Sequence, residues 1–230
     1  MITKTKINLK RFIQKIFLSN IATKSDIELL YSNIYGLFNI NNSISGRIAL
    51  NPMRGWAISP DVMTWVLAGM QVIKNPLVIE FGSGQSTIIL AATLKHLGGK
   101  LISVEHDVEY SQKIQSQLIA CGLSDVVRTL HIPLVNYVDY ISYDISCIAD
   151  LGMPDLAIVD GPPSSNGLMT RYIPLKWCVS NMKKGGLIYL DDSFREGEKL
   201  CISKLEQEFP QVLKISELSA EKGLTEIRLI

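Results

Sequence analysis

From Leu77 to the end of the chain, short apolar runs alternate with stretches in which apolar residues recur every three or four positions. The short runs predict strands, and the stretches between most of them predict helices, the last at about 194–209. Apolar strands separated by helices are typical of a parallel sheet covered on both faces. The pattern therefore predicts a doubly wound, mainly parallel α/β fold, in which the last two strands could form a hairpin that turns one of them antiparallel. The seven expected strands lie near 77–81, 100–104, 126–131, 155–159, 186–191, 211–216 and 224–229.

Before Leu77 the periodicity is helical. We expect helices at 6–18 and 24–38, then an Asn-rich loop, and then a third helix with Ser59 as its N-cap and Pro60 at its first position. The chain would thus consist of a helical extension and loop, residues 1–58, and one α/β domain, residues 59–230. The face of the third helix expected to point inward carries Val62, Trp65, Val66 and Gly69.

Composition narrows the class of protein. The chain has 230 residues, 47% of them hydrophobic, which is enough for one full core. The formal net charge is +1 and no basic block runs through the body of the chain, which argues against nucleic acid as the main partner. Four scattered cysteines without a CxxC pair indicate a reducing compartment, and no apolar run reaches the length of a membrane span. We therefore expect a cytoplasmic protein.

The segment LVIEFGSGQSTIILAA places an acid and two glycines between an expected strand and an expected helix. Gly82 and Gly84 allow a sharp turn and a close approach of a ligand to the backbone, although such glycines also occur in turns that bind nothing. Ser86 and Thr87 stand where a dinucleotide-binding loop has its third glycine, and Glu80 would repel a phosphate. The loop therefore favours a cationic ligand.

A second acid, Glu105, ends the next expected strand in LISVEHD, where it could accept hydrogen bonds from both hydroxyls of a ribose. Ser83 in the glycine loop and His106 beside the acid belong to the same candidate site. A ligand with a ribose, a positive charge and no phosphate fits this pattern. S-adenosylmethionine is such a ligand.

From about Ser59 onward the sequence resembles the class I S-adenosylmethionine-dependent methyltransferases. The resemblance implies a seven-stranded sheet, a first loop that holds the methionine end of the cofactor, and a second-strand acid that holds the ribose. The acid that this family often uses for adenine is missing, since TLHIPLVNY offers only His131 and Asn136. The residues that carry the resemblance are Glu80, Gly82, Gly84, Glu105, Asp160 in LAIVDGPP, and the segment GGLIYLDD.

Three further acids follow two other strands. Asp160 ends the strand before Gly-Pro-Pro, and Asp191 and Asp192 end the next one. Carboxylates at the ends of buried strands are costly unless they are paired or bind a metal, and a set of oxygen ligands suits Mg²⁺. Alternatively, Asp160 caps the next helix and the Asp pair forms a solvated turn. Since successive strand residues face opposite ways, both members of the pair can reach one ion only if the strand stops at Asp191.

The arrangement of these acids is similar to that in metal-dependent O-methyltransferases of the catechol and macrolide-sugar type. It implies methyl transfer to a hydroxyl of a small molecule or sugar, with assistance from Mg²⁺. The lysine base that catechol-type enzymes have shortly after the first metal acid is missing. Asp160 and Arg171 are the candidate catalytic residues, and Arg171 either holds an anionic or sugar substrate or is an exposed helix residue. His106 and His131 are either bases or structural residues.

Several alternatives stay open. The basic, amphipathic start of the chain either packs on its own domain or a homodimer mate, or lies on an anionic membrane. Trp56 either closes over the site or anchors the loop in the core. A metal-free methyltransferase acting on N or O, a cofactor-binding adaptor and an aminopropyltransferase are the competing functions. The acids at four strand ends argue against the adaptor, and the lack of an acidic polyamine channel argues against the aminopropyltransferase.

Overall fold

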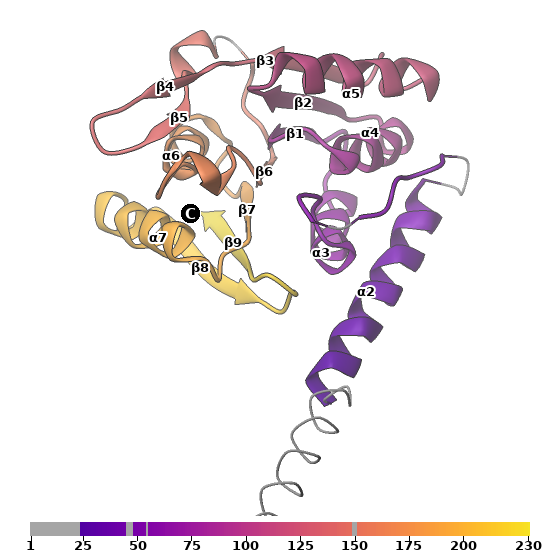
Figure 1. Ribbon diagram of the computed structural model, residues 1–230, viewed down its shortest axis with the longest axis horizontal. Coiled ribbons are helices and arrows are strands. Elements are labelled where there is room, and N and C mark those ends of the chain that lie inside the picture. Colours follow the sequence, from indigo (N-terminus) through magenta and orange to yellow (C-terminus); the bar gives the residue numbers. More distant parts are fainter. Residues whose placement is uncertain (1–23, 45–47, 54, 149–150) are drawn as a thin grey trace, which may run out of the picture.

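The computed structural model describes residues 24–44, 48–53, 55–148 and 151–230. The helix expected at 6–18 lies outside this part of the chain. The main body is a seven-stranded sheet of order β3-β2-β1-β6-β7-β9-β8, in which β9 runs antiparallel to β7 and to β8 (Figure 1). The predicted doubly wound fold and its terminal hairpin are confirmed. The strands are β1 (Leu77–Phe81), β2 (Lys100–Glu105), β3 (Val127–His131), β6 (Leu156–Val159), β7 (Leu187–Asp191), β8 (Leu213–Leu218) and β9 (Leu224–Leu229).

Helices cover both faces of the sheet, with α3, α4 and α5 on one side and α6 and α7 on the other (Figure 1). Each face has its own apolar core, one built with Leu90 of α4 and the other with Leu175 of α6. None of the described helices is long and apolar enough to span a membrane. The helices are α2 (Lys24–Ser43), α3 (Pro60–Gln71), α4 (Gln85–Leu97), α5 (Val108–Ala120), α6 (Tyr172–Asn181) and α7 (Glu196–Glu208), with short 3-10 turns η1 (Ile145–Cys147) and η2 (Ser164–Asn166).

Helix α3 begins as predicted, with Ser59 as N-cap and Pro60 in its first turn. Its predicted inward face is partly wrong. Trp65 is exposed and donates its indole N–H to Ser219 O. Because α3 packs against both the sheet and α2, its buried stripe also includes Met63 and Met70.

Helix α2 is longer than the predicted 24–38 and packs along α3. Gly36 makes this approach possible, since a Cβ there would lie 2.2 Å from Pro60 O. Ile40 and Ile44 are buried in the same contact. Other large apolar side chains of α2 remain exposed, among them Leu30, Ile34 and Phe38.

The sequence did not predict the two-stranded hairpin of β4 (Leu134–Asn136) and β5 (Ile141–Tyr143). It places Tyr143 in the core beside Phe81, with ring centroids 5.8 Å apart. The order of strands in the main sheet reverses between β1 and β6, where the loops after these strands lie side by side. In doubly wound folds, ligands bind at this point.

Candidate functional site

The loop after β1 crosses the loop after β6 with almost no space between the two backbones. Gly82 has φ +98°, and a Cβ there would lie 2.9 Å from Gly161 N. Gly161 N in turn donates to Phe81 O at 2.7 Å. Gly82 is therefore required both by its left-handed backbone and by the close approach of Gly161. Helix α4 starts immediately afterwards, with Gly84 as its N-cap.

Glu80 lies beneath this loop and is completely buried. Its Oε2 accepts hydrogen bonds from Thr87 Oγ1 at 2.6 Å and from Ser103 Oγ at 2.9 Å, while its Oε1 has no partner among the residues that the structure describes. Burial raises the pKa of Glu80 to about 7, with a smaller contribution from Glu105, although the hydroxyls oppose the rise. Thr87 Oγ1 also accepts from Gly84 N, so that this network supports the loop from below.

Glu105 ends β2 and holds the two loops beside it. Its Oε1 accepts from His106 N, Asp107 N and His106 Nδ1 at 2.8–2.9 Å, while Oε2 accepts from Ser83 N at 3.0 Å. Burial alone would raise the pKa of Glu105, but the bonds from His106 and the backbone outweigh it and lower this pKa. The same contact raises the pKa of His106. A single bond to Oε2 leaves this oxygen able to accept another.

A cavity of about 450 Å³ opens above these loops, at the carboxyl ends of β1, β2 and β6. It brings together most of the predicted cofactor residues, but neither Glu80 nor Thr87 lines it. The direct contact predicted for these two side chains is thus not supported by their positions, because the loop covers them. The predicted residues on its wall are Gly82, Ser83, Gly84, Ser86, Glu105 and His106.

Sequence reasoning missed other walls of this cavity, Tyr110 and Tyr143 among them. Tyr143 comes from the unpredicted hairpin, and no local pattern marks it. His131 and Asn136, considered for adenine, are exposed and do not line the cavity, and His131 Nε2 lies 3.0 Å from His106 O. A larger groove of about 760 Å³ lies between α2 and residues 50–53 and 55–60, away from the strand ends, so it is not the candidate site.

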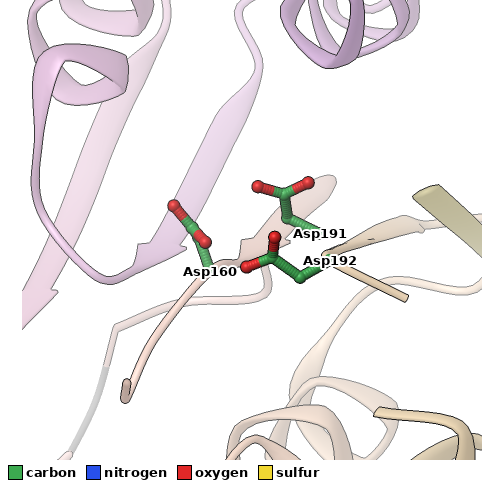
Figure 2. A group of neighbouring side chains, drawn as sticks. All are labelled: Asp160, Asp191 and Asp192. Atoms are coloured by element: carbon green, nitrogen blue, oxygen red, sulfur yellow. The ribbon is translucent and has the colours of Figure 1, made fainter. Parts of the chain in front are cut away.

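The three predicted metal-binding acids meet at the ends of β6 and β7 (Figure 2). One carboxylate oxygen of each of Asp160, Asp191 and Asp192 lies within 4.8 Å of the others. Strand β7 stops at Asp191, and Asp192 has φ +55°, which turns its side chain to the same side. A shared site required the strand to stop at Asp191, and this condition is met. The alternative of a solvated turn is wrong, because Asp191 and Asp192 are both buried.

The prediction that Arg171 could be an exposed helix residue is wrong. Its side chain lies in the core and the residue is 2% exposed. Its Nη2 contacts Asp160 Oδ1 at 3.2 Å and Asp192 Oδ2 at 3.1 Å, and Nη1 donates to Asp191 O at 2.8 Å. Its Nε faces Glu198 Oε1 at 3.5 Å. Since its guanidinium is directed at these groups, a role in holding a substrate anion is not favoured.

The acid cluster carries a large electrostatic cost. Burial, together with the charge of Asp191, raises the pKa of Asp160 well above its usual range although Arg171 opposes the rise. Burial and the neighbouring Asp192 raise the pKa of Asp191 to about 6. Asp191 Oδ1 and Asp192 Oδ1 are buried without a hydrogen-bond partner among the described residues. Such oxygens are costly unless another group binds them.

A second cavity of about 440 Å³ adjoins the first and is bounded by Asp160 and Asp192 of the acid cluster. Both cavities share the walls Trp56, Asp160 and Pro163. Trp56 is 79% exposed, so the interpretation as a core anchor is wrong. Arg195, which the sequence did not single out, also lines the second cavity, and its Nη1 contacts Asp192 Oδ2 at 2.8 Å.

Comparison with known proteins agrees with this architecture. A family model described as a methyltransferase domain matches residues 79–193. An O-methyltransferase from Bacillus cereus, solved in complex with SAH, is 16% identical with a TM-score of 0.61, over 85% of this chain and 91% of its own. The SAH-bound methyltransferase PaMTH1 from Podospora anserina is 15% identical with a TM-score of 0.62, over 90% and 95%.

A third solved structure is the O-methyltransferase TomG from Streptomyces achromogenes, involved in tomaymycin synthesis and solved in complex with SAM. It is 16% identical with a TM-score of 0.55, over 94% of each chain. No match was found among curated proteins. At these low identities, the similarity to the solved structures shows a shared fold. The family model covers half of the sequence, including the glycine loop and the acid cluster. The chain therefore belongs to the methyltransferase domain family, among the class I S-adenosylmethionine-dependent methyltransferases.

Proposed function

We propose that this methyltransferase uses S-adenosylmethionine (SAM) to methylate a hydroxyl of a small molecule or sugar. The observation that carries the proposal is the pair of adjoining cavities at the strand ends, one beside the glycine loop and Glu105, the other beside the acid cluster. The O-methyltransferases of similar fold support the choice of oxygen as acceptor. Their complexes with SAM or S-adenosylhomocysteine (SAH) support the choice of cofactor.

In this proposal the first cavity holds the cofactor. Glu105 Oε2 accepts one hydrogen bond from Ser83 N and accepts a second from a ribose hydroxyl, and His106 lies beside the nucleoside. The backbone of Gly82, Ser83 and Gly84 approaches the methionine end, where the start of α4 directs its free N–H groups. Glu80 and Thr87 act from beneath, by holding this loop in place.

The second cavity then holds the acceptor. Methyl transfer needs the acceptor oxygen in line with the methyl group and about 3 Å from it, so correct placement supplies much of the rate. Asp160 lines both cavities and is the side chain closest to this requirement. We assign it the role of positioning the acceptor hydroxyl and receiving its proton. Arg171 fixes the carboxylate of Asp160 in turn.

The acid cluster also fits a divalent cation. Three carboxylates offer oxygen ligands, and Oδ1 of Asp191 and Oδ1 of Asp192 are buried and have no hydrogen-bond partner in the described part of the chain. We propose that Asp160, Asp191 and Asp192 would hold Mg²⁺, which would supply a positive charge that lowers the pKa of the acceptor hydroxyl.

One observation favours a metal-free methyltransferase instead. Arg171 forms ion pairs with Asp160 and Asp192, so it already supplies positive charge where the sequence suggested that a metal would be needed. In that case Arg171 orients Asp160, which acts on the acceptor alone. The two mechanisms differ in whether the cluster binds a cation.

Calorimetric titration of Mg²⁺ into the protein, together with transfer of labelled methyl from SAM to a pool of hydroxylated aromatics and sugars, separates the two. We expect Mg²⁺ binding that Asp191→Asn abolishes and that Glu206→Gln, an exposed acid on α7, leaves unchanged. We also expect EDTA to stop transfer. No Mg²⁺ binding, with undiminished transfer in EDTA, would refute the metal site and leave the metal-free mechanism.

We further propose a cytoplasmic protein that forms a homo-oligomer through its N-terminal helices, with no nucleic-acid partner. The exposed apolar side chains of α2 support the homo-oligomer, because a second copy of the chain could cover them. Helix α2 has no Lys or Arg after Lys24 that would attract an anionic membrane instead. The cysteines in the described part are free, which fits a reducing compartment. We keep 1–58 as the extension and 59–230 as the catalytic domain in this proposal.

A further inference from the structure

Three residues line both cavities, and we call the boundary that they form the opening. Trp56, Asp160 and Pro163 line the cavity beside the glycine loop and also the cavity beside the acid cluster. If the first holds the donor and the second the acceptor, the methyl group must cross here, because the reacting atoms have to approach to about 3 Å. In that arrangement, the side chains at this opening lie beside the reacting sulfur.

Trp56 is unusual among these residues. It is 79% exposed, whereas tryptophan side chains are mostly buried in folded proteins. Within the described part of the chain, its indole forms no hydrogen bond, no ring contact and no contact with a cationic side chain. Most of its ring is thus accessible to a ligand at the opening.

The backbone on both sides of Trp56 is nevertheless fixed. Lys222 Nζ donates to Gly55 O at 2.8 Å and to Ala57 O at 3.4 Å, which ties the segment to the turn between β8 and β9. A few residues further on, Asp61 Oδ2 accepts from Glu221 N at 2.7 Å and ties α3 to the same turn. The ring is therefore exposed although the segment that carries it is attached to the domain.

We propose that the indole face of Trp56 binds the positively charged sulfonium of the methyl donor, a role that rests on the proposed use of SAM. Indole is the aromatic side chain that attracts cations most strongly, and the attraction grows when the pair is shielded from water. During transfer the bond between sulfur and methyl breaks, its electron pair stays on sulfur, and a new bond joins the methyl carbon to the acceptor oxygen, whose proton leaves. Sulfur becomes neutral, so the contact favours the donor over the product.

This difference between donor and product gives the test. Calorimetry would measure the dissociation constants of SAM and SAH for the wild type, Trp56→Leu and Trp56→Phe. Trp65→Leu is the matched control, because Trp65 is also exposed but lies on α3 with its indole bound to Ser219 O. We expect Trp56→Leu to weaken SAM binding about tenfold and to change SAH binding far less, with Trp56→Phe in between. Trp65→Leu should change neither.

The other outcomes are distinct. Equal weakening of SAM and SAH by Trp56→Leu would show that Trp56 is only a wall of the cavity and would overturn the inference, as would unchanged binding of both ligands. A wild-type protein that binds neither SAM nor SAH would overturn the proposed function itself.

Discussion

Replacing Glu80 with Gln should make the protein more stable above neutral pH and change little in acid. Glu80 is completely buried, and its pKa is about 7 instead of 4.5, chiefly because burial disfavours the charged form. The folded protein thus holds this proton more tightly than the unfolded chain does. The contribution of Glu80 to the free energy of unfolding is therefore highest below pH 4.5 and is lost as the pH rises through 7.

The magnitude follows from the difference between 4.5 and about 7. At about 1.4 kcal/mol for each pH unit, ionised Glu80 costs about 3 kcal/mol of unfolding free energy at pH 8. Gln is neutral and can still accept the hydrogen bonds from Thr87 and Ser103. We therefore expect Glu80→Gln to exceed the unfolding free energy of the wild type by less than about 1 kcal/mol at pH 5 and by about 3 kcal/mol at pH 8.

Urea denaturation at pH 5, 6, 7 and 8 would measure this, with Glu206→Gln as the control for removing an exposed carboxylate. Taking the difference between variant and wild type cancels most of the titration of the other acids. An unfolding free-energy difference that stays constant from pH 5 to pH 8 would refute the claim that Glu80 is buried with a raised pKa.

Two further predictions concern the loop and the start of the chain. Gly82→Ala should destabilise the protein by about 2 kcal/mol more than Gly122→Ala. Both glycines have a positive φ, but of the two only Gly82 has another backbone within contact distance of an added Cβ. Thermal denaturation of both variants would test this, and equal losses of stability would contradict it. Removing residues 1–19 should change the sedimentation or the melting temperature but not the affinity for SAH. Loss of SAH binding in the truncated chain, or salt-sensitive binding of the full chain to anionic vesicles, would contradict that assignment.

The alternation of apolar runs was sufficient to predict the main sheet, because strand patterns are local. Acids at strand ends were also visible, since residues such as Glu105 and Asp160 directly follow apolar runs, and the parallel sheet brings these ends to one edge. The β4–β5 hairpin was not predicted, because its strands have only three residues each and lack a clear alternation. Tyr143 was missed for the same reason.

The environment of Arg171 could not be predicted from local pattern. Its partners Asp160, Asp192 and Glu198 lie on three separate segments, and their meeting depends on how α6 and α7 pack against the sheet. The burial of Glu80 could not be predicted either. An acid before a glycine loop has the same sequence pattern whether its side chain contacts the ligand or supports the loop from beneath. Burial and tertiary contacts decide both questions, and neither has a sequence signature.

Calorimetric titration of SAH into the wild type and Glu105→Gln tests the central claim most directly, because it requires no knowledge of the acceptor. We predict that the wild type binds SAH and does not bind NAD. Glu105→Gln should bind SAH at least about tenfold more weakly, since it removes the charge from the hydrogen bond to the ribose. A wild type that fails to bind SAH, or a variant that binds it with wild-type affinity, would contradict the account.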